Sequence, residues 1–270
     1  MAKFKHVLIT GGAGYIAANL SNYLHSGKDI IVSNHVDKVW ENRVEDMRNV
    51  LEYDVIVHLA AMSSIGDCMD DIDGSIRDNV LAPLNIFKLA KEQGIPVIFT
   101  SSQAAKIPEA NFYAMQKRIA EIEAKRLNGI GADIKVLRLT NVYGGFNFLK
   151  KKTTVVANFI NAIKKEENLI VNGNGEQVRD YIHVDDVCNA IYKCIDYNAP
   201  ISEPIDICTG IGTSVFSLAK MTKGDFVFDE YSKMVGTLRN VGDPAKAKEI
   251  INFKVTKATE KLEDYIKKQI

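Results

Sequence analysis

Short apolar stretches alternate along the first half of the chain with longer segments whose apolar residues recur every three or four positions. Short apolar runs predict buried strands, whereas the three-to-four spacing predicts amphipathic helices. This alternation indicates an α/β fold with a parallel sheet wrapped by helices. We expect strands at 6–9, 29–33, 54–59, 96–100 and 134–139, and helices at 15–24, 73–93 and 108–127.

The first predicted strand leads into a glycine-rich turn at residues 11–14, and a helix follows from Tyr15. Gly11 allows a tight turn, and Gly14 lets the backbone approach a pyrophosphate, which the N–H groups and dipole of the helix start favour. Ala17 occupies the position at which such turns often have a third glycine, where a small residue lets the helix pack closely on the strand. Because strand, turn and helix occur in this order, a dinucleotide site on a Rossmann-type, doubly wound sheet is favoured over a turn that binds nothing.

Beyond residue 144 the regular alternation ends. Helices are predicted at 153–165, 185–197, 214–221 and 256–268, with one short strand at 168–171. This pattern is too irregular for a second doubly wound sheet. We therefore expect a dinucleotide-binding domain over 1–144 and a smaller, mainly substrate-binding C-terminal lobe over 145–270, from which segments at about 180–210 return to the main sheet.

The charge balance limits the classes of binding partner, and the cysteines indicate the cellular compartment. A formal net charge of +0 argues against nucleic acid or an anionic membrane surface as a partner. No apolar stretch is long enough to span a bilayer, and we expect no signal peptide before the first strand. The four cysteines lack CxxC spacing and paired histidines, so we expect free thiols in a cytoplasmic protein, with no metal and no disulfide.

Candidate chemistry lies on the predicted helix 108–127. Tyr113 and Lys117 are four residues apart and share one helix face. An ammonium beside a phenol favours the phenolate, so we expect the pKa of Tyr113 to fall from about 10 toward neutrality, which suits a general base or acid. Ser102 ends the preceding strand, where a hydroxyl can share the same substrate oxygen. Such a pair alone is more often a solvated helix face; its place after the glycine turn and Ser102 favours catalysis.

These motifs, in this order, resemble the extended short-chain dehydrogenases/reductases, and among them the NAD-dependent epimerase/dehydratase family, whose members include UDP-glucose 4-epimerase-like nucleotide-sugar enzymes. The resemblance covers nearly the whole chain. It rests on the segments 10–16, 46–49, 58–61, 79–80, 137–144, 173–186 and 243–247, and on Ser102, Tyr113 and Lys117 as the family's catalytic triad.

The resemblance implies a set of cofactor contacts and leaves the type of dinucleotide open. Ser33 stands where NAD-binding relatives carry an acid, and no arginine follows that would accept a 2′-phosphate. We expect NAD, because Asp37 is near and Arg43 is distant, and NADP stays an alternative. The implied contacts are Gly11, Gly14, Tyr15, Ile16, Ser33, Asn34, Asp46, Met47, Leu59, Ala60, Ala61, Asn79, Tyr113, Lys117 and Thr140.

The resemblance also implies a nucleotide-diphosphate sugar as substrate. Arg179 is expected to pair with the diphosphate, although a surface ion pair with Asp180 or Asp185 is the alternative. His58 and His183 are expected to be core residues. The implied substrate contacts are Ser102, Asn141, Arg179 and, on a looser match, Lys233 or Arg239.

The residues after Ser102 select among the family's reactions. Related sugar dehydratases place an Asp-Glu pair there, whereas this chain has Gln103 and Ala104, which cannot transfer protons. The favoured function is therefore a nucleotide-sugar 4-epimerase that oxidises C4 transiently and returns the hydride. The alternatives are an NADP-dependent 4-keto reductase and a dinucleotide sensor without turnover. A homodimer through the helices 73–93 and 108–127 is expected from the family.

Overall fold

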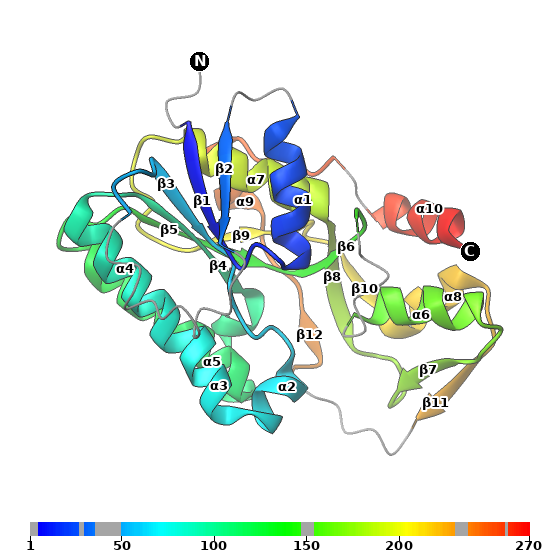
Figure 1. Ribbon diagram of the computed structural model, residues 1–270. Helices are drawn as coiled ribbons and strands as arrows, with labels where there is room; N and C mark the ends of the chain where they lie inside the picture. The colour runs from blue at the N-terminus through cyan, green and yellow to red at the C-terminus, as the bar shows by residue number, and fades with distance from the viewer. Residues whose placement is uncertain (1–4, 27–29, 36–49, 147–153, 230–236, 257–258) are drawn as a thin grey trace.

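A computed structural model describes residues 5–26, 30–35, 50–146, 154–229, 237–256 and 259–270 (Figure 1). Its main sheet is parallel throughout, and the chain steps from β1 to β2 on one side before crossing to β3 on the other. The doubly wound α/β fold is thereby confirmed, with its switch point between β1 and β3, where such sheets bind ligands. The strand order is β2 (Ile31–His35), β1 (His6–Thr10), β3 (Val55–His58), β4 (Val97–Ser102), β5 (Ile134–Leu139) and β9 (Ile205–Ile207).

Alternating side chains of the strands build two apolar layers, one on each face of the sheet. Val7 and Ile9 of β1 pack on one face with α1 (Tyr15–His25), α7 (Val184–Asp196) and α9 (Ala245–Ile251). Leu8 packs on the opposite face with α4 (Ala82–Gln93) and α5 (Phe112–Asn128). The strands therefore have the continuous apolar character of a sheet that is buried on both sides (Figure 1).

The predicted helix 73–93 consists of two α-helical parts joined by a π-helical turn. These parts are α3 (Ile72–Ile76) and α4, with the turn at η1 (Arg77–Leu81), where the Ala82 N–H donates to the carbonyl of Arg77. Pro83, which has no N–H to give to the regular ladder, lies directly after this turn. Gly94 ends α4 in the left-handed region, with φ at 72°. A short helix, α2 (Ile65–Asp70), precedes α3.

The predicted helix 108–127 begins later than its pattern indicates. Two short 3₁₀ turns, η2 (Gln103–Lys106) and η3 (Pro108–Ala110), follow β4. Asn111 is extended, with φ at −170°, and its side chain accepts a hydrogen bond from the Ala114 N–H at 2.9 Å. This N-cap starts α5 at Phe112 and puts Tyr113 in the first helical turn.

The second half of the chain forms most of the smaller lobe around a core of its own. Strand β8 (Val178–His183) pairs with β6 (Asn141–Tyr143), β10 (Gly212–Ser214) and β12 (Arg239–Asn240), and β7 (Leu169–Asn172) pairs with β11 (Phe226–Asp229). Val156 and Phe159, in the predicted helix 153–165, are 2% exposed there, as core residues. The helices of the lobe are α6 (Val155–Lys164), α8 (Val215–Thr222) and α10 (Thr259–Gln269).

Several elements escape the sequence pattern because they are short. Strands β6, β9, β10 and β12 have two or three residues each, too few to show an apolar period. Strand β9 nevertheless joins the main sheet beside β5, and α9 packs on the same face of the sheet as α1. No helix among the described residues is both long and apolar enough to cross a membrane.

Candidate active site

The glycine turn joins β1 to α1 at the carboxyl edge of the sheet. Gly11 has φ at +70°, and a Cβ there would lie 2.8 Å from the Cα and N atoms of Ala60. The Gly14 N–H donates to the Gly11 carbonyl at 2.8 Å and closes the turn. The helix start carries no acidic residue in its first turn, so its N–H groups and dipole can attract an anion. Because position 11 has no room for a side chain, the turn packs directly on the backbone after β3, and Gly11 and Gly14 line a cleft at the start of α1, as a bound dinucleotide requires.

A cleft of about 790 Å³ extends from this turn along the ends of β4, β5 and β8. It brings together most of the site residues expected from the sequence. Arg179 and Arg239 line it from the lobe. From the main sheet and its helices it is lined by Gly11, Gly14, Tyr15, Ile16, Leu59, Ala61, Ser102, Tyr113, Lys117, Thr140 and Asn141.

Ser102, Tyr113 and Lys117 meet where β4 faces α5. Ser102 Oγ accepts a hydrogen bond from the Ala104 N–H at 3.2 Å. Lys117 is buried, and its Nζ donates to the carbonyl of Thr100 at 3.2 Å and lies 6.0 Å from the centroid of the Tyr113 ring. A hydroxyl, a phenol and an ammonium therefore share one wall of the cleft, as general acid–base chemistry requires.

The structure corrects the expected acidity of Tyr113. Burial raises the pKa of Tyr113 to about 12, against the effect of a hydrogen bond with Ser102. The ammonium of Lys117 does not offset this desolvation, because it is directed at the Thr100 carbonyl and lies 5.0 Å from the centroid of the Phe99 ring. Burial also lowers the pKa of Lys117 to about 8, whereas Cys68 and Glu121 raise it.

The lobe supplies two cations to the opposite wall of the cleft. Arg179 on β8 donates from Nη1 to the carbonyls of Val178 and Leu238, at 2.9 and 3.4 Å. Asp180, the alternative partner, instead accepts hydrogen bonds from Thr209 and Gly210. Within the described part of the chain Arg179 has no carboxylate partner, and Arg239, which lies opposite Val178 in the register of β12 and β8, lines the same cleft. Two arginines that line one cleft suit a diphosphate.

Other expected residues lie away from the cleft. Asn79 is fully buried, and its side-chain amide is hydrogen-bonded to the backbone of Met62 and to Gln116. It therefore holds the loop after β3 in place and does not face the cleft. Asn34 Oδ1 accepts from Ser21 Oγ at 3.0 Å. Ser33 and Ala60 do not line the cleft either. Asp46, Met47 and Lys233 lie outside the described residues.

Both histidines expected in the core are buried. His58 is 1% exposed, with Nδ1 2.7 Å from Thr10 Oγ1, and burial lowers its pKa to about 3. His183 is 6% exposed. The four cysteines are free and buried, and the described ranges contain no cluster of residues that could hold a metal.

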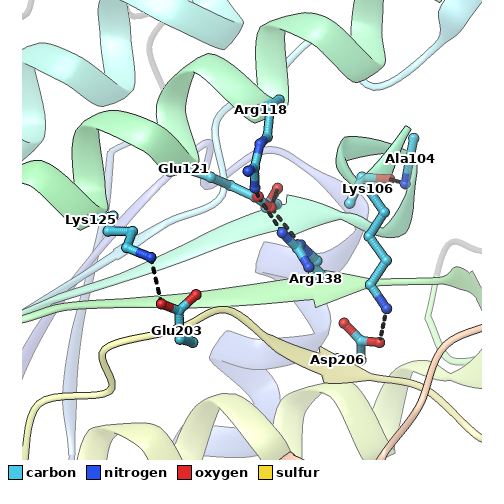
Figure 2. A network of polar contacts seen from close by, with 10 residues as sticks. Ala104, Lys106, Arg118, Glu121, Lys125, Arg138, Glu203 and Asp206 are labelled. Carbon is cyan, nitrogen blue, oxygen red and sulfur yellow. Dashed lines mark hydrogen bonds and ion pairs between the residues drawn. The ribbon is translucent and has the colours of Figure 1, made fainter. Parts of the chain in front are cut away.

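Sequence reasoning missed several residues of the cleft wall. Ser63 and Ser64 follow β3, and Gln103 and Lys106 follow Ser102. The 3₁₀ turn η2 brings Lys106 to the cleft, and its Nζ contacts Asp206 of β9 at 2.5 Å (Figure 2). The short segment between Ser102 and Tyr113 was the available signal, since every residue in so short a connection lies close to the catalytic groups.

Comparisons with known proteins give the family of this chain. Residues 7–208 match the model of the NAD dependent epimerase/dehydratase family. A putative UDP-glucose 4-epimerase of Methanocaldococcus jannaschii is 27% identical, covering 82% of this chain and 83% of that protein. A GDP-6-deoxy-D-talose 4-dehydrogenase of Aggregatibacter actinomycetemcomitans is 29% identical, with 80% and 78% covered. The UDP-glucose 4-epimerase of Thermotoga maritima, solved with UDP-glucose, shares the fold at a TM-score of 0.85 and 24% identity, with 97% of each chain covered. The chain therefore belongs to the NAD dependent epimerase/dehydratase family, and NAD is its cofactor.

Proposed function

We propose that this enzyme is a nucleotide-sugar 4-epimerase of the UDP-hexose type. The observation that carries the proposal is the single cleft that joins the glycine turn, the Ser102–Tyr113–Lys117 wall and the two arginines of the lobe. The name of the Methanocaldococcus relative supports the same reaction. The cleft runs from the glycine turn to the lobe, so it offers a place for a dinucleotide at the turn and for a sugar nucleotide toward the lobe.

The chain's own residues take distinct roles in this reaction. Tyr113 removes the proton of the sugar C4 hydroxyl, to which Ser102 also hydrogen-bonds. After the 4-keto sugar has rotated in the cleft, Tyr113 returns a proton to the C4 oxygen. Lys117 lies on the same wall, with its ammonium 6.0 Å from the centroid of the Tyr113 ring. Its positive charge favours the phenolate that forms during the reaction, although burial outweighs this effect in the free enzyme. Arg179 and Arg239 bind the diphosphate and hold the nucleotide while the sugar turns. NAD, when bound, supplies the hydride acceptor and donor.

Loss of water is not part of the proposed reaction. Gln103 and Ala104 occupy the cleft wall directly after Ser102, where a dehydratase needs two acid–base groups. An amide and a methyl group cannot transfer protons at neutral pH. The enzyme is therefore expected to leave the C6 hydroxyl of its substrate in place.

A 4-keto reductase is the second candidate, and the dehydrogenase relative from Aggregatibacter favours it. The two are separated by incubating the purified enzyme with a panel of UDP-hexoses without added cofactor and following the anomeric proton by NMR. An epimerase interconverts the C4 epimers under these conditions. Absence of any epimer, together with net oxidation of NADPH on a 4-keto sugar, would assign the enzyme as a reductase instead.

We also propose that the enzyme is a homodimer, which the outer faces of the helices α3 to α5 support. Met115, Ile119 and Ile122 of α5 are 41%, 38% and 57% exposed and recur at helical spacing. Ile72 at the start of α3 and Leu81 at the end of η1 add exposed apolar side chains. Such a stripe is typical of an interface between subunits. Light scattering should give twice the chain mass, and Ile122→Lys should lower it; a monomer mass for the wild type contradicts the dimer.

The proposed location is the cytoplasm, because the four buried cysteines are free, which suits a reducing compartment. Fractionation of cells that express a tagged chain tests this location, and recovery outside the cytoplasmic fraction contradicts it.

A further inference from the structure

Glu121 is a buried carboxylate on the same face of α5 as the proposed catalytic residues. It follows Lys117 by four residues and is 3% exposed. Its Oε1 accepts from Ser101 Oγ at 2.7 Å and from Arg138 Nε at 2.8 Å, and its Oε2 accepts from Arg138 Nη2 at 2.6 Å and Arg118 Nη1 at 3.2 Å. Figure 2 shows Arg118 and Arg138 converging on this carboxylate. A charge this deeply buried is tolerated only because it is fully paired.

The partners of Glu121 adjoin the cleft. Ser101 directly precedes Ser102 on β4, and Arg138 lies opposite Ser101 in the parallel register of β4 and β5. Two residues after Arg138, Thr140 lines the cleft. One carboxylate thus connects α5 to both strand ends that form the floor of the site.

Other contacts also hold α5 in place, among them the hydrogen bond from Lys117 Nζ to the Thr100 carbonyl of β4. Ala120 and Ala124 are fully buried in the layer beneath the helix. Small methyl groups let the helix approach closely, but their contacts have no direction, because dispersion forces act equally on all sides. A two-bond fork between a carboxylate and a guanidinium has a fixed geometry and supplies that direction.

We propose that Glu121 is a positioning residue that fixes Tyr113 and Lys117 against the strand end bearing Ser102. The inference rests on the proposed function, in which these three residues act on the sugar. It assigns to the Glu121–Arg138–Ser101 contacts the task of holding the phenol and the hydroxyl at the spacing that one substrate oxygen needs.

The charge of Glu121 also acts on Lys117. Several groups face the Lys117 ammonium: Cys68 from α2, His58 from β3, the Thr100 carbonyl and Phe99 ring from β4, and Tyr113 from its own helix. Burial lowers the pKa of Lys117, and Glu121 opposes this shift. Removing the Glu121 charge leaves two arginines behind and lowers the pKa of Lys117 further, so Lys117 then loses its proton at a lower pH.

The test compares Glu121→Gln with a matched control on the same helix. Glu123 holds Arg126 in a similar two-bond fork, with both contacts at 2.7 Å, on the exposed side of α5.

For Glu121→Gln we expect kcat to fall about 10²-fold with KM nearly unchanged. NMR titration of the enzyme with isotope-labelled lysine should show a lower pKa for Lys117. Glu123→Gln should match the wild type in both measurements. A Glu121→Gln enzyme with wild-type kcat and a wild-type Lys117 pKa overturns the inference.

If Glu121→Gln does not fold, a milder variant tests the positioning role of Glu121. Ser101→Ala removes one hydrogen bond to Glu121 and leaves every charge in place. We expect kcat to fall about tenfold and the pKa of Lys117 to stay where it is. Wild-type kcat in Ser101→Ala then rejects the positioning role. Failure of the proposed function is distinct, because in that case the wild-type enzyme itself produces no C4 epimer.

Discussion

The two walls of the cleft differ in how their polar groups are held. On the catalytic wall, Lys117 donates to a backbone carbonyl and Ser102 accepts from a backbone N–H, behind which lies the buried carboxylate of Glu121. On the lobe wall, the hydrogen bonds of Arg179 to described residues go to two backbone carbonyls, and Arg239 is exposed. The difference suggests that geometry is fixed where a proton must move, whereas charge is kept available where an anion must bind.

The largest expected effect is on the catalytic wall. Tyr113→Phe removes the proton acceptor but keeps the ring volume, so kcat should fall by roughly 10²–10⁴ while NAD binding is retained. Tyr143→Phe is the matched control, because the hydroxyl of Tyr143 is buried outside the cleft and accepts no bond in the described structure. The measurement is turnover of the sugar nucleotide beside quantification of bound dinucleotide. Wild-type turnover in Tyr113→Phe would make the Tyr113–Lys117 pair an ordinary helix face.

On the lobe wall, the expected effect is on binding. Arg179→Met should raise KM by about 10- to 10²-fold with a smaller change in kcat, since a charged hydrogen bond to the diphosphate contributes about 1.5–3 kcal/mol. Arg179→Lys should recover part of this loss, because an ammonium keeps the charge but not the two-bond fork. Steady-state kinetics at low and high salt measure both. If KM does not change, Arg179 does not contact the substrate.

Beneath the catalytic wall, His58 makes stability depend on pH. Its pKa is about 3 in the folded protein and about 6.5 in the unfolded chain. Between these values the unfolded chain binds a proton that the folded protein excludes, so the free energy of unfolding should fall as the pH drops from 6.5 to 3. Each unit of the difference corresponds to about 1.4 kcal/mol. Urea unfolding across this range should show a flatter pH dependence for His58→Gln; an unchanged slope would exclude His58 as its source.

The smallest effect is expected outside both walls. Lys125 and Glu203 form an ion pair at 2.6 Å with exposed side chains (Figure 2). Lys125→Ala should leave kcat and KM unchanged and alter the free energy of unfolding by less than about 1 kcal/mol, because water and salt screen the pair. Chemical denaturation together with steady-state kinetics tests this, and a marked loss of activity would mean that the catalytic wall extends further along α5 than its contacts indicate.

Local signals in the sequence were enough to predict the central features of the fold. The apolar run from His6, the turn at Gly11 and the helix from Tyr15 follow one another in the chain, so their order predicts their geometry. Tyr113 and Lys117 share a face for the same reason. The start of α5 was missed because the Asn111 cap, a side-chain hydrogen bond, has no apolar period.

Features that depend on distant residues could not be predicted. Asn79 belongs to a motif of cofactor-binding proteins, yet its amide is taken by Met62 and Gln116. The pKa of Tyr113 is raised mainly by burial, and the spacing of residues in the sequence does not show how deeply a side chain is buried. Glu121, Arg138 and Ser101 form one network only after β4, β5 and α5 have packed together.

The position of β9 has a consequence for synthesis on the ribosome. This strand covers the outer side of β5, yet the chain reaches it only after passing through the lobe. A nascent chain that has emerged only as far as Gly144 lacks β9 and also α7 and α9, so the apolar strand Ile134–Leu139 keeps an unpaired edge, a template for aggregation. At about 5–20 residues per second this exposure lasts several seconds. The nucleotide-binding half is therefore vulnerable during translation until its closing strand arrives from the other half of the chain.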